Sequence, residues 1–426
     1  MTERQYKDSG IEWIGDIPND WDVKRIKYAV VEMGSGTTPS SDNSHFYGGD
    51  IPWIQSGDLY NTPLITKTSK TVTEQAFQSC SALKIFHKPY IVIAMYGASV
   101  GNVSMSLIDA CTNQACCVIK PNANNNLAYL KYWLEICKTD FINKSVGGGQ
   151  PNISQDKIRE QAYICPSLEE QQQIADFLDS KTASIDSAIQ AQKAIIEKLK
   201  EYKQAVITNS IEKYVDKDTK MSRLKFFTYM KGRIGWQGLG SDDFISEGPY
   251  CITSTDFEND KVNWEKCYHV SEERYEMDPK IQVKIGDILI SKDGTIGKLA
   301  RISELPGKAC LNSHLLILRS NPEILNSDYL YYLLKSQLFV NYYKFSSNGS
   351  IMQSLSQKNM AQFSVPLLPV EIQKQIALYL DTEILKIDKA IEQKNAIIEK
   401  LEEYKKSIIY NAVTGKIDCR KDVIPE

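Results

Sequence analysis

The stretch "AIIEKLKEYKQAVITNS" at residues 194–210 returns as "AIIEKLEEYKKSIIYNA" at residues 396–412. Both copies belong to a longer match, because residues 173–209 align with residues 375–411 at a constant offset of 202 and without a gap. About half of the paired positions are identical. One long period with two copies indicates a duplicated half-molecule rather than a solenoid, which needs several short repeats.

Each copy has the pattern of a long amphipathic helix. Apolar side chains recur at spacings of three, four and seven, and neither copy contains glycine or proline. A helix of about 45 residues is about 65 Å long at 1.5 Å per residue, and it cannot bury a narrow apolar stripe alone. The predicted packing core consists of Ile185, Ile189, Ile196, Leu199, Ile387, Ile391, Ile398 and Leu401.

The natural partner of each helix is its own twin. Two near-identical helices related by a two-fold axis across their length run antiparallel, so the sequence predicts an antiparallel coiled coil with pseudo-two-fold symmetry. The alternative is that each helix docks separately on its own domain. Whether the pair forms within one chain or between two chains stays open at this point.

The segments before the helices have the composition of two mixed domains. Short strand patterns (89–97 and 286–294) alternate with Gly- and Ser-rich turns, and each segment has a helix pattern near its end (127–137 and 327–338). We therefore predict an α+β protein in which two long helices separate two mixed α/β domains. The expected boundaries are 1–165 for the first domain, 166–213 for the first helix, 214–368 for the second domain, 369–418 for the second helix and 419–426 for a tail.

Composition excludes several classes of function. The start is polar, no apolar run reaches the length of a membrane span, and the ten cysteines and four histidines are scattered without metal-ligand spacing. We therefore expect a reduced cytoplasmic protein with no membrane association and no metal site. Taken alone, a formal net charge of −3 argues mildly against a nucleic-acid binder, so a DNA-binding surface would have to come from the arrangement of charge or be shared with a basic partner. The sequence lacks the phosphate-loop, nucleophile-elbow and zinc-protease motifs, which indicates a chain without catalytic residues.

At this point several stretches resemble one known family. They are "EEQQQIADFLD" (169–179), "IQKQIALYLD" (372–381), "VTGKID" (413–418), "YKDSGIEWIGDIPNDWDVKRIK" (6–27), "IPWIQSGDL" (51–59) and "GDILISKDGTIGK" (286–298). Together they are similar to the specificity subunits of type I restriction–modification systems, and the resemblance covers essentially the whole chain.

The resemblance implies a non-catalytic subunit with two target-recognition domains, each reading one half of a gapped, asymmetric site in double-stranded DNA. It implies two adenine methyltransferase subunits and two restriction subunits as partners. The long helices would set the gap and carry the docking surfaces. No cofactor is expected in this chain, and S-adenosylmethionine, ATP and Mg²⁺ are expected in the partner subunits.

Candidate DNA contacts are polar side chains in the predicted loops, since hydrogen-bonding groups read base edges and cations contact phosphates. In the first domain they are Ser35, Thr37, Thr38, Ser40, Lys67, Lys70, Tyr96, Ser99 and Gln150. In the second domain they are Lys231, Arg233, Thr253, Ser254, Thr255, Lys292, Asp293 and Thr295. The alternative is that these Gly-, Ser- and Thr-rich stretches are ordinary turns and that the aromatic residues pack inside.

Two other functions remain as alternatives to a specificity subunit. A self-sufficient restriction–modification polypeptide would transfer methyl groups by itself, and a coiled-coil scaffold would bind no DNA even with its partners present. The sequence does not give the recognised DNA sequence, nor whether this copy is an active or a silent allele.

Overall fold

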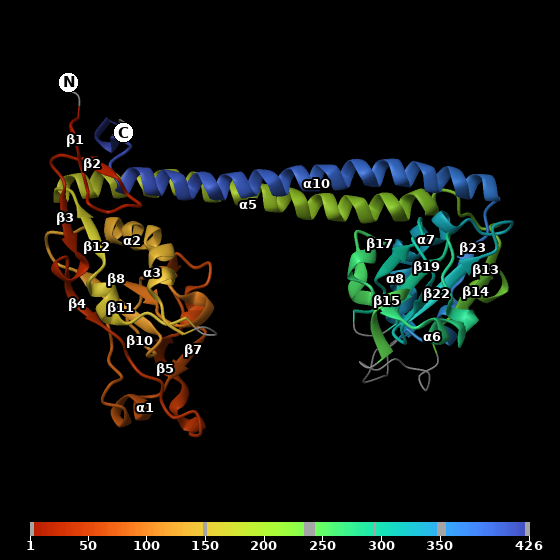
Figure 1. Ribbon diagram of the computed structural model, residues 1–426, viewed down its shortest axis with the longest axis horizontal. Helices are drawn as coiled ribbons and strands as arrows, with labels where there is room; N and C mark the ends of the chain where they lie inside the picture. Colours follow the sequence, from red (N-terminus) through yellow and green to blue (C-terminus); the bar gives the residue numbers. More distant parts are fainter. Residues whose placement is uncertain (1–3, 148–150, 234–242, 293–294, 347–354, 422–426) are drawn as a thin grey trace. The chain divides into compact units, whose positions relative to one another are not determined.

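The computed structural model describes residues 4–147, 151–233, 243–292, 295–346 and 355–421 (Figure 1). The chain divides into two compact units. Unit 1 comprises residues 1–191 and 396–426, and unit 2 comprises residues 192–395. Each unit therefore holds one mixed domain together with a segment of both long helices, and the division falls inside the helices rather than at the expected domain boundaries.

The two long helices are α5 (Leu168–Glu212) and α10 (Val370–Val413). The first agrees closely with the expected range of 166–213. The second ends five residues before the expected 418 because Gly415 adopts a φ of +75°, which favours glycine and ends a helix. A side chain is also excluded here, since a Cβ on Gly415 would lie 2.3 Å from Cδ of Pro18.

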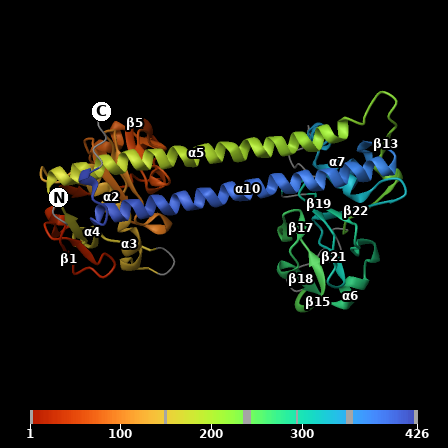
Figure 2. The same ribbon diagram turned by 90° about the horizontal axis from the view of Figure 1, so that it is seen from above.

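Each unit contains the same helix–helix contact. In unit 1, Nζ of Lys405 lies 2.7 Å from Oδ1 of Asp186. In unit 2, Nζ of Lys203 lies 2.6 Å from Oδ1 of Asp388. The beginning of α5 thus lies beside the end of α10, and the end of α5 beside the beginning of α10 (Figure 2). The antiparallel direction is confirmed, and the pairing is made within one chain; pseudo-two-fold placement of the two units stays a prediction.

The predicted packing positions are withdrawn from solvent to different degrees. Five are buried, namely Ile185, Ile189, Ile196, Ile387 and Ile398. Leu199, Ile391 and Leu401 are half-buried. In unit 2 the helices also share the core of the domain, where Ile207 and Ile211 of α5 and Ile376 and Leu380 of α10 join one cluster with Leu330 and Phe363.

The mixed domain of unit 1 is built on a five-stranded sheet. Its spatial order is β4 (Val30–Gly34), β11 (Cys116–Pro121), β8 (Tyr90–Ala94), β9 (Val103–Ser106) and β6 (Leu64–Ile65). Every residue of β8 is buried, as expected for a continuous apolar run in a central strand. A second sheet consists of β10 (Cys111–Thr112), β5 (Tyr47–Ile54) and β7 (Lys70–Val72), and shorter pairs are β1 (Tyr6–Asp8) with β2 (Asp16–Pro18) and β3 (Asp22–Arg25) with β12 (Ala162–Cys165).

The mixed domain of unit 2 repeats this plan. Its main sheet has the order β14 (Thr228–Lys231), β22 (Leu315–Ser320), β19 (Ile288–Ser291) and β20 (Leu299–Arg301). The second sheet consists of β18 (Tyr268–Val270), β15 (Phe244–Ile252) and β21 (Ala309–Leu311), and the pairs are β13 (Met221–Arg223) with β23 (Ser364–Pro366) and β16 (Phe257–Glu258) with β17 (Lys261–Val262). Both domains contain a parallel pair at the matching place, β5 with β10 and β15 with β21, and unit 1 has a further parallel pair, β6 with β9.

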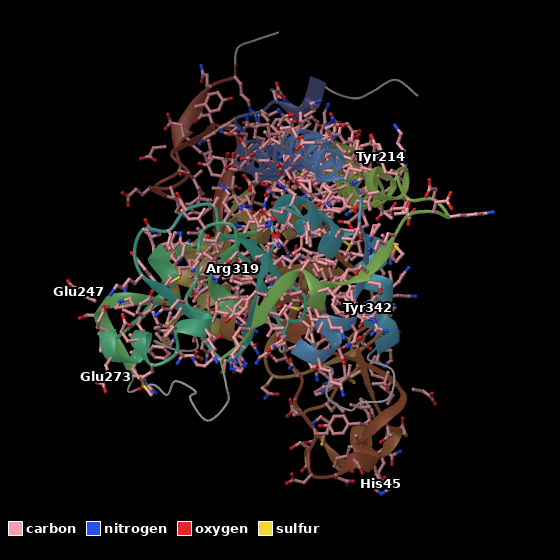
Figure 3. All side chains as sticks on the ribbon, turned by 90° about the vertical axis from the view of Figure 1, so that its right-hand side faces the viewer. His45, Tyr214, Glu247, Glu273, Arg319 and Tyr342 are labelled. Carbon is pink, nitrogen blue, oxygen red and sulfur yellow. The ribbon has the colours of Figure 1, made fainter. Side chains whose placement is uncertain are left out.

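Short helices also correspond between the units. Unit 1 has α1 (Glu74–Ser79), α2 (Leu127–Ile136), α3 (Lys138–Lys144) and α4 (Gln155–Arg159). Unit 2 has α6 (Glu272–Glu276), α7 (Ser327–Lys335), α8 (Gln337–Ser346) and α9 (Gln357–Gln362). The duplication seen in the long helices therefore extends through the domains, and the predicted helices near 127–137 and 327–338 are confirmed. At the surface of unit 2 the labelled Glu247 and Glu273 point outward (Figure 3).

A buried glutamine attaches each domain to its long helix. In unit 1, Oε1 of Gln171 accepts a hydrogen bond of 2.8 Å from the amide of Asn126, and its Nε2 donates to the carbonyl of Pro166. In unit 2, Gln373 accepts a bond of the same length from the amide of Asn326 and donates to Leu368. Both glutamines are fully buried.

A tyrosine–aspartate hydrogen bond lies about two helical turns further along each long helix, at Asp179 and Asp381. The hydroxyl of Tyr132 donates to Asp179 at 2.6 Å, and that of Tyr332 donates to Asp381 at 2.7 Å. Burial raises the pKa of both tyrosines, and the neighbouring carboxylate raises it further, so each hydroxyl keeps the proton that it donates. In unit 2 the guanidinium of Arg301 also lies 3.0 Å from Asp381.

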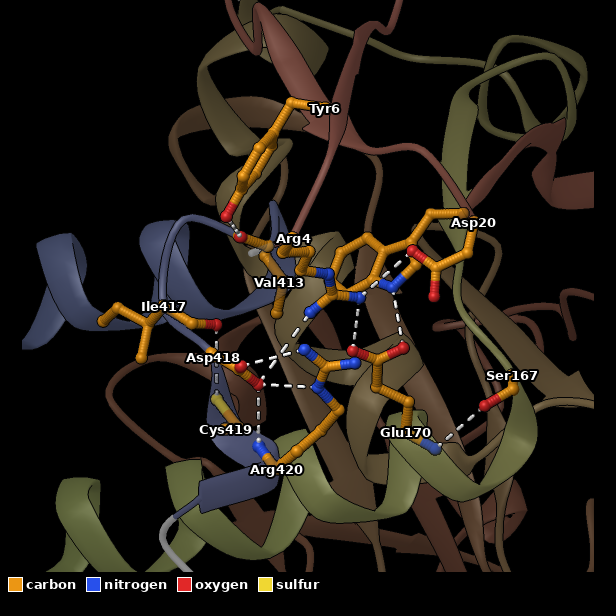
Figure 4. Close-up of polar contacts among 12 residues, drawn as sticks. Arg4, Tyr6, Asp20, Ser167, Glu170, Val413, Ile417, Asp418, Cys419 and Arg420 are labelled. Atoms are coloured by element: carbon orange, nitrogen blue, oxygen red, sulfur yellow. Dashed lines mark hydrogen bonds and ion pairs between the residues drawn. The ribbon is translucent and has the colours of Figure 1, made fainter. Parts of the chain in front are cut away.

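Unit 1 has a feature without a counterpart in the described residues of unit 2, which we call the clasp: Arg4, Trp21, Glu170 and Asp418 (Figure 4). Glu170 of α5 accepts hydrogen bonds from Nη2 of Arg4 at 2.6 Å and from Nε1 of Trp21 at 2.8 Å. Nη1 of Arg4 lies 4.0 Å from Asp418, beyond the end of α10. The clasp joins the N-terminal segment, the start of α5 and the segment after α10.

Within the described residues, no helix is long and apolar enough to cross a membrane. Eight of the ten cysteines are buried, and Cys80 and Cys165 are half-buried.

Candidate nucleic-acid interface

Four loop segments of unit 1 adjoin one another at the ends of its central strands. Oγ of Ser35 accepts a hydrogen bond from Nε2 of Gln155 at 2.6 Å. The hydroxyl of Thr38 donates to Oε1 of Gln114 at 2.5 Å. We call residues 35–38, 95–99, 112–115 and 151–155 the unit 1 recognition surface.

Backbone hydrogen bonds fix these segments to one another. The amide of Met95 donates to the carbonyl of Ala115 at 2.8 Å, and the amide of Ile153 donates to the carbonyl of Met95 at 2.9 Å. Gly36 approaches its neighbour closely, since a Cβ at this position would lie 2.0 Å from the carbonyl oxygen of Thr112. Glycine is therefore needed at position 36 for the packing of backbone on backbone.

Unit 2 builds the corresponding surface with the same backbone contacts. The amide of Lys292 donates to the carbonyl of His314 at 3.0 Å, and the amide of Leu355 donates to the carbonyl of Lys292 at 2.8 Å. We call residues 231–233, 292, 311–314 and 355 the unit 2 recognition surface. Part of the matching loops lies outside the described residues.

One turn shows how the two surfaces differ. Oδ1 of Asn113 accepts from the amide of Ala115 at 3.1 Å, and Oδ1 of Asn312 accepts from the amide of His314 at 3.0 Å. The backbone is the same, but Gln114 and Ala115 in unit 1 stand where unit 2 has Ser313 and His314. Two domains that recognise different DNA sequences would need such a turn, with the same backbone and different side chains.

The predicted contact residues fall into four groups by exposure. Exposed are Thr38, Ser40, Lys67, Lys70, Tyr96, Thr255 and Thr295. Half-buried are Ser35, Thr37, Ser99, Lys231, Thr253, Ser254 and Lys292. Arg233 is buried, and Gln150 and Asp293 lie outside the described residues.

The structure corrects the expectation for Arg233. Its side chain is 3% exposed, and its Nε donates a hydrogen bond of 2.9 Å to the carbonyl of Leu311. The guanidinium thus holds the turn of the unit 2 recognition surface from inside instead of reaching out as a base reader. The sequence alone does not show whether a single arginine in a Gly-rich stretch is buried and structural or exposed and available to contact bases.

Lys67 and Lys70 are both exposed. Lys70 is on β7 and pairs with Trp53 of β5, whose other neighbour in the sheet is Cys111. In the second domain, Thr253–Thr255 form a capped turn in which the amide of Thr253 donates to the buried Asp256 at 2.7 Å. These residues flank the recognition surfaces.

Gln114 and Gln155 are two further candidate contacts that were not predicted from the sequence. Both occur in stretches that match between the halves, "NQ" with "NS" and "GGGQPNISQDKI" with "NGSIMQSLSQKN". For Gln114 the available signal was a matched position with a different side chain, Ser313, whereas Gln155 is matched by an identical residue, Gln357. Amide side chains suit base edges, because Gln and Asn pair with adenine through two hydrogen bonds.

Comparison with known protein families shows to which family this chain belongs. The family model described as "Type I restriction modification DNA specificity domain" matches the chain twice, over residues 18–201 and 239–403. The chain belongs to this family of type I restriction–modification specificity subunits. The two matches follow the internal duplication, with one specificity domain and its helix in each.

Curated relatives are similar over different lengths. The MjaIX specificity subunit of Methanocaldococcus jannaschii is 34% identical over 201 residues, which are 46% of this chain and 45% of that protein. The putative MjaX specificity subunit of the same organism is 24% identical over 95% of both chains. The chain thus spans less than half of the first relative but nearly all of the second.

Solved structures share the fold. A chain from a study of complex assembly and conformational transition of the type I R-M system has a TM-score of 0.74 at 15% identity, covering 94% of this chain and 99% of that one. The HsdS subunit from Thermoanaerobacter tengcongensis has a TM-score of 0.52 at 16% identity, covering 94% and 98%. Two sheet-rich domains on two long helices that pack together are therefore the fold of this family.

Among the described residues, no three His, Cys, Asp or Glu side chains are placed to hold a metal ion. In the described parts of the recognition surfaces the polar side chains are mainly amides and hydroxyls, with a few cations in unit 2. Their chemistry suits hydrogen bonding to an extended polar ligand.

Proposed function

We propose that this chain is the non-catalytic subunit that selects the DNA site of a type I restriction–modification complex. Each recognition surface reads one half of a bipartite, gapped and asymmetric site in double-stranded DNA. The observation that carries the proposal is the Asn113/Asn312 turn, because one backbone frame presents two different sets of hydrogen-bonding side chains.

The long helices act as the spacer between the half-sites. Both are continuous and belong to both units, and half-sites read from one face of DNA recur about every 34 Å. Deleting seven residues from one helix should change the gap or abolish assembly while the bases of both half-sites stay the same. A change in the half-site bases would contradict the spacer role.

Catalysis is assigned to partner subunits. Two adenine methyltransferase subunits use S-adenosylmethionine, and two restriction subunits use ATP and Mg²⁺, in the cytoplasm. The formal net charge of −3 agrees with this arrangement, because bound partners can supply the phosphate contacts that dominate DNA affinity.

The adenine methylome tests the proposal. The chain is expressed with its cognate methyltransferase subunit in a host without adenine methylation, and modified bases are mapped by sequencing. One gapped, two-part motif methylated on both strands is expected. A stable complex without any new motif would favour a scaffold without DNA specificity or a silent allele. Methyl transfer by the chain alone would favour a self-sufficient enzyme.

A further inference from the structure

The two recognition surfaces differ in charge. The unit 1 recognition surface contains no Lys, Arg, His, Asp or Glu in any of its four segments. The residues that define the unit 2 recognition surface include no acidic side chain but four basic ones, namely Lys231, Arg233, Lys292 and His314. Arg233 is buried and bonded to the turn, so it is not available at the surface. The polar groups at the two surfaces therefore differ in kind.

Lys292 stands where unit 1 has a methionine. The amide and the carbonyl of Lys292 bond to His314 and Leu355, and those of Met95 bond to the corresponding residues of unit 1. Both residues also follow the buried strand in the middle of their sheet, β19 or β8. Met95 is 3% exposed, whereas Lys292 is half-buried. One backbone position thus carries a cation in unit 2 and an apolar side chain in unit 1.

The ammonium of Lys292 crosses the end of the main sheet of unit 2. A Cβ at Gly232, directly after β14, would lie 3.6 Å from Nζ of Lys292, so the side chain extends from the end of β19 past β22 towards β14. Among the described residues, none forms a hydrogen bond or an ion pair with this ammonium. Donors that are partly withdrawn from water need acceptors. The ammonium therefore suits a ligand that supplies acceptor atoms at this place.

The place of Lys292 favours a base edge over a phosphate as that ligand. Its backbone is held by the turn that ends at His314 on one side and by Leu355 on the other, so the ammonium lies within the surface and not at its rim. Phosphates line the rims of a DNA groove, and base edges form its floor. An ammonium donates only, and in the major groove guanine presents two neighbouring acceptors, O6 and N7, whereas adenine presents a donor beside its acceptor.

We propose that Lys292 donates to O6 and N7 of a guanine, so that the half-site read by unit 2 contains a G·C pair specified by this one residue. The inference rests on the proposed function and adds to it the base and the residue that selects it. The side chain of Met95 has no donor, so the same position of unit 1 selects no guanine. Amides and hydroxyls are left to read the other half-site.

The adenine methylome of Lys292→Met tests the inference. Methionine is the residue that unit 1 carries on the same backbone, so the change is expected to preserve the fold. In the complex with the methyltransferase subunit, one G·C pair of one half-site should relax, with the preference for guanine falling about tenfold, while the other half-site and the gap stay as in the natural chain. Lys292→Arg should keep the guanine, because a guanidinium also donates to O6 and N7. Lys284→Met, an exposed residue before the other end of β19, is the control and should leave the whole motif unchanged.

A binding measurement on the natural complex needs no variant. Each guanine of the motif is replaced in turn by 7-deazaguanine, which lacks the N7 acceptor but still pairs with cytosine. Replacement of one guanine should weaken duplex binding about fivefold or more, and the complex that carries Lys292→Met should bind both duplexes equally.

The outcomes separate this inference from the proposed function. A motif that Lys292→Met leaves intact, or no loss of binding at any 7-deazaguanine, would overturn the guanine contact alone. Binding by Lys292→Met that is weaker for every duplex, with a salt dependence reduced by about one phosphate contact, would overturn it in favour of a phosphate contact. A natural chain whose complex methylates no gapped motif would overturn the proposed function as well.

Discussion

In unit 1 and unit 2 the domain is attached to its long helix by the same glutamine contacts, but the chain enters the two domains in different ways. In unit 2 the chain runs without a break from α5 through residues 213–220 into β13. In unit 1 the corresponding connection does not exist, because α10 ends at Val413 and the domain begins near the N-terminus. The clasp joins these two ends by side-chain contacts. A covalent link in one unit is thus replaced by buried polar contacts in the other.

The comparison separates two kinds of residue. Gln171 and Gln373 are the same in both units because they satisfy the same backbone groups at the start of each long helix. Glu170 has an apolar counterpart, Ile372, because only unit 1 has an N-terminal segment to hold. Residues shared by the two units attach each domain to its long helix, and residues found only in unit 1 hold its N-terminal segment in place.

The largest effect is expected from Glu170→Ala. Glu170 and Arg4 are nearly buried, with side chains 9% and 10% exposed, and removal of the carboxylate leaves the guanidinium and the indole N–H of Trp21 without this acceptor. Breaking a buried pair costs about 3 kcal/mol. Hydrogen exchange should show the loss at β3 of unit 1 and no change at β13 of unit 2.

The exposed neighbour supplies the control. Glu169→Ala on the same helical turn should change the free energy of unfolding by less than about 0.5 kcal/mol. A loss below about 1 kcal/mol for Glu170→Ala, or an equal loss in unit 2, would refute the role of the clasp.

The next effect should be equal in the two units. Gln171→Leu and Gln373→Leu each leave the amide of an asparagine, Asn126 or Asn326, without its acceptor in a buried site. We expect a loss of about 2 kcal/mol in the unfolding free energy of the unit concerned. Urea titration followed by hydrogen exchange measures it, and Gln375→Leu, on the exposed face of α10, is the control. If the losses of unfolding free energy differed strongly between the units, the two glutamines would not have equivalent roles.

A smaller effect should differ between the units. The buried hydroxyl of Tyr129 donates to the carbonyl of Ile164 at 3.0 Å and lies 3.2 Å from that of Val413, whereas the hydroxyl of Tyr329 finds no partner in the described part of unit 2. Tyr129→Phe should cost about 1 kcal/mol, and Tyr329→Phe should cost nothing or stabilise unit 2 slightly. Thermal unfolding of the two variants measures the difference. Equal losses of stability would contradict the claim that the hydroxyl of Tyr129 is hydrogen-bonded and that of Tyr329 is not.

The smallest effect concerns the two ion pairs between the long helices. Double-mutant cycles with alanine on Lys203 with Asp388, and on Lys405 with Asp186, should give coupling free energies of about 0.5 kcal/mol each, because the pairs are half-exposed. In 1 M salt the coupling should nearly vanish. Coupling that persists in high salt would indicate a buried contact.

The sequence predicted the long helices well because their signals are local and repeated. Spacing of Ile and Leu, the absence of Gly and Pro, and the constant offset of 202 all point to the same elements. The division into compact units was not predicted, since it depends on which helix segment packs against which domain. The clasp was also missed, because Arg4 and Asp418 lie at opposite ends of the chain.

The recognition surfaces were predicted only in part. Loops at 34–38 and 96–99 were found from their Gly and Ser content, but such composition does not tell which side chain points outward. Arg233 was misplaced because its buried acceptor, the carbonyl of Leu311, is distant in sequence. Gln114 and Gln155 become candidates only when the fold brings their loops to Thr38 and Ser35.

The most direct test of the account is the methylome of chains changed in one recognition surface at a time. One variant carries Thr38→Ala with Gln114→Ala in unit 1, and the other carries Lys292→Ala with His314→Ala in unit 2. Each should relax or alter the bases of one half-site, a different half for each variant, while the other half and the gap stay as in the natural chain. Variants that change both half-sites together, or that leave the motif intact, would contradict the claim that each unit reads its own half of the DNA site.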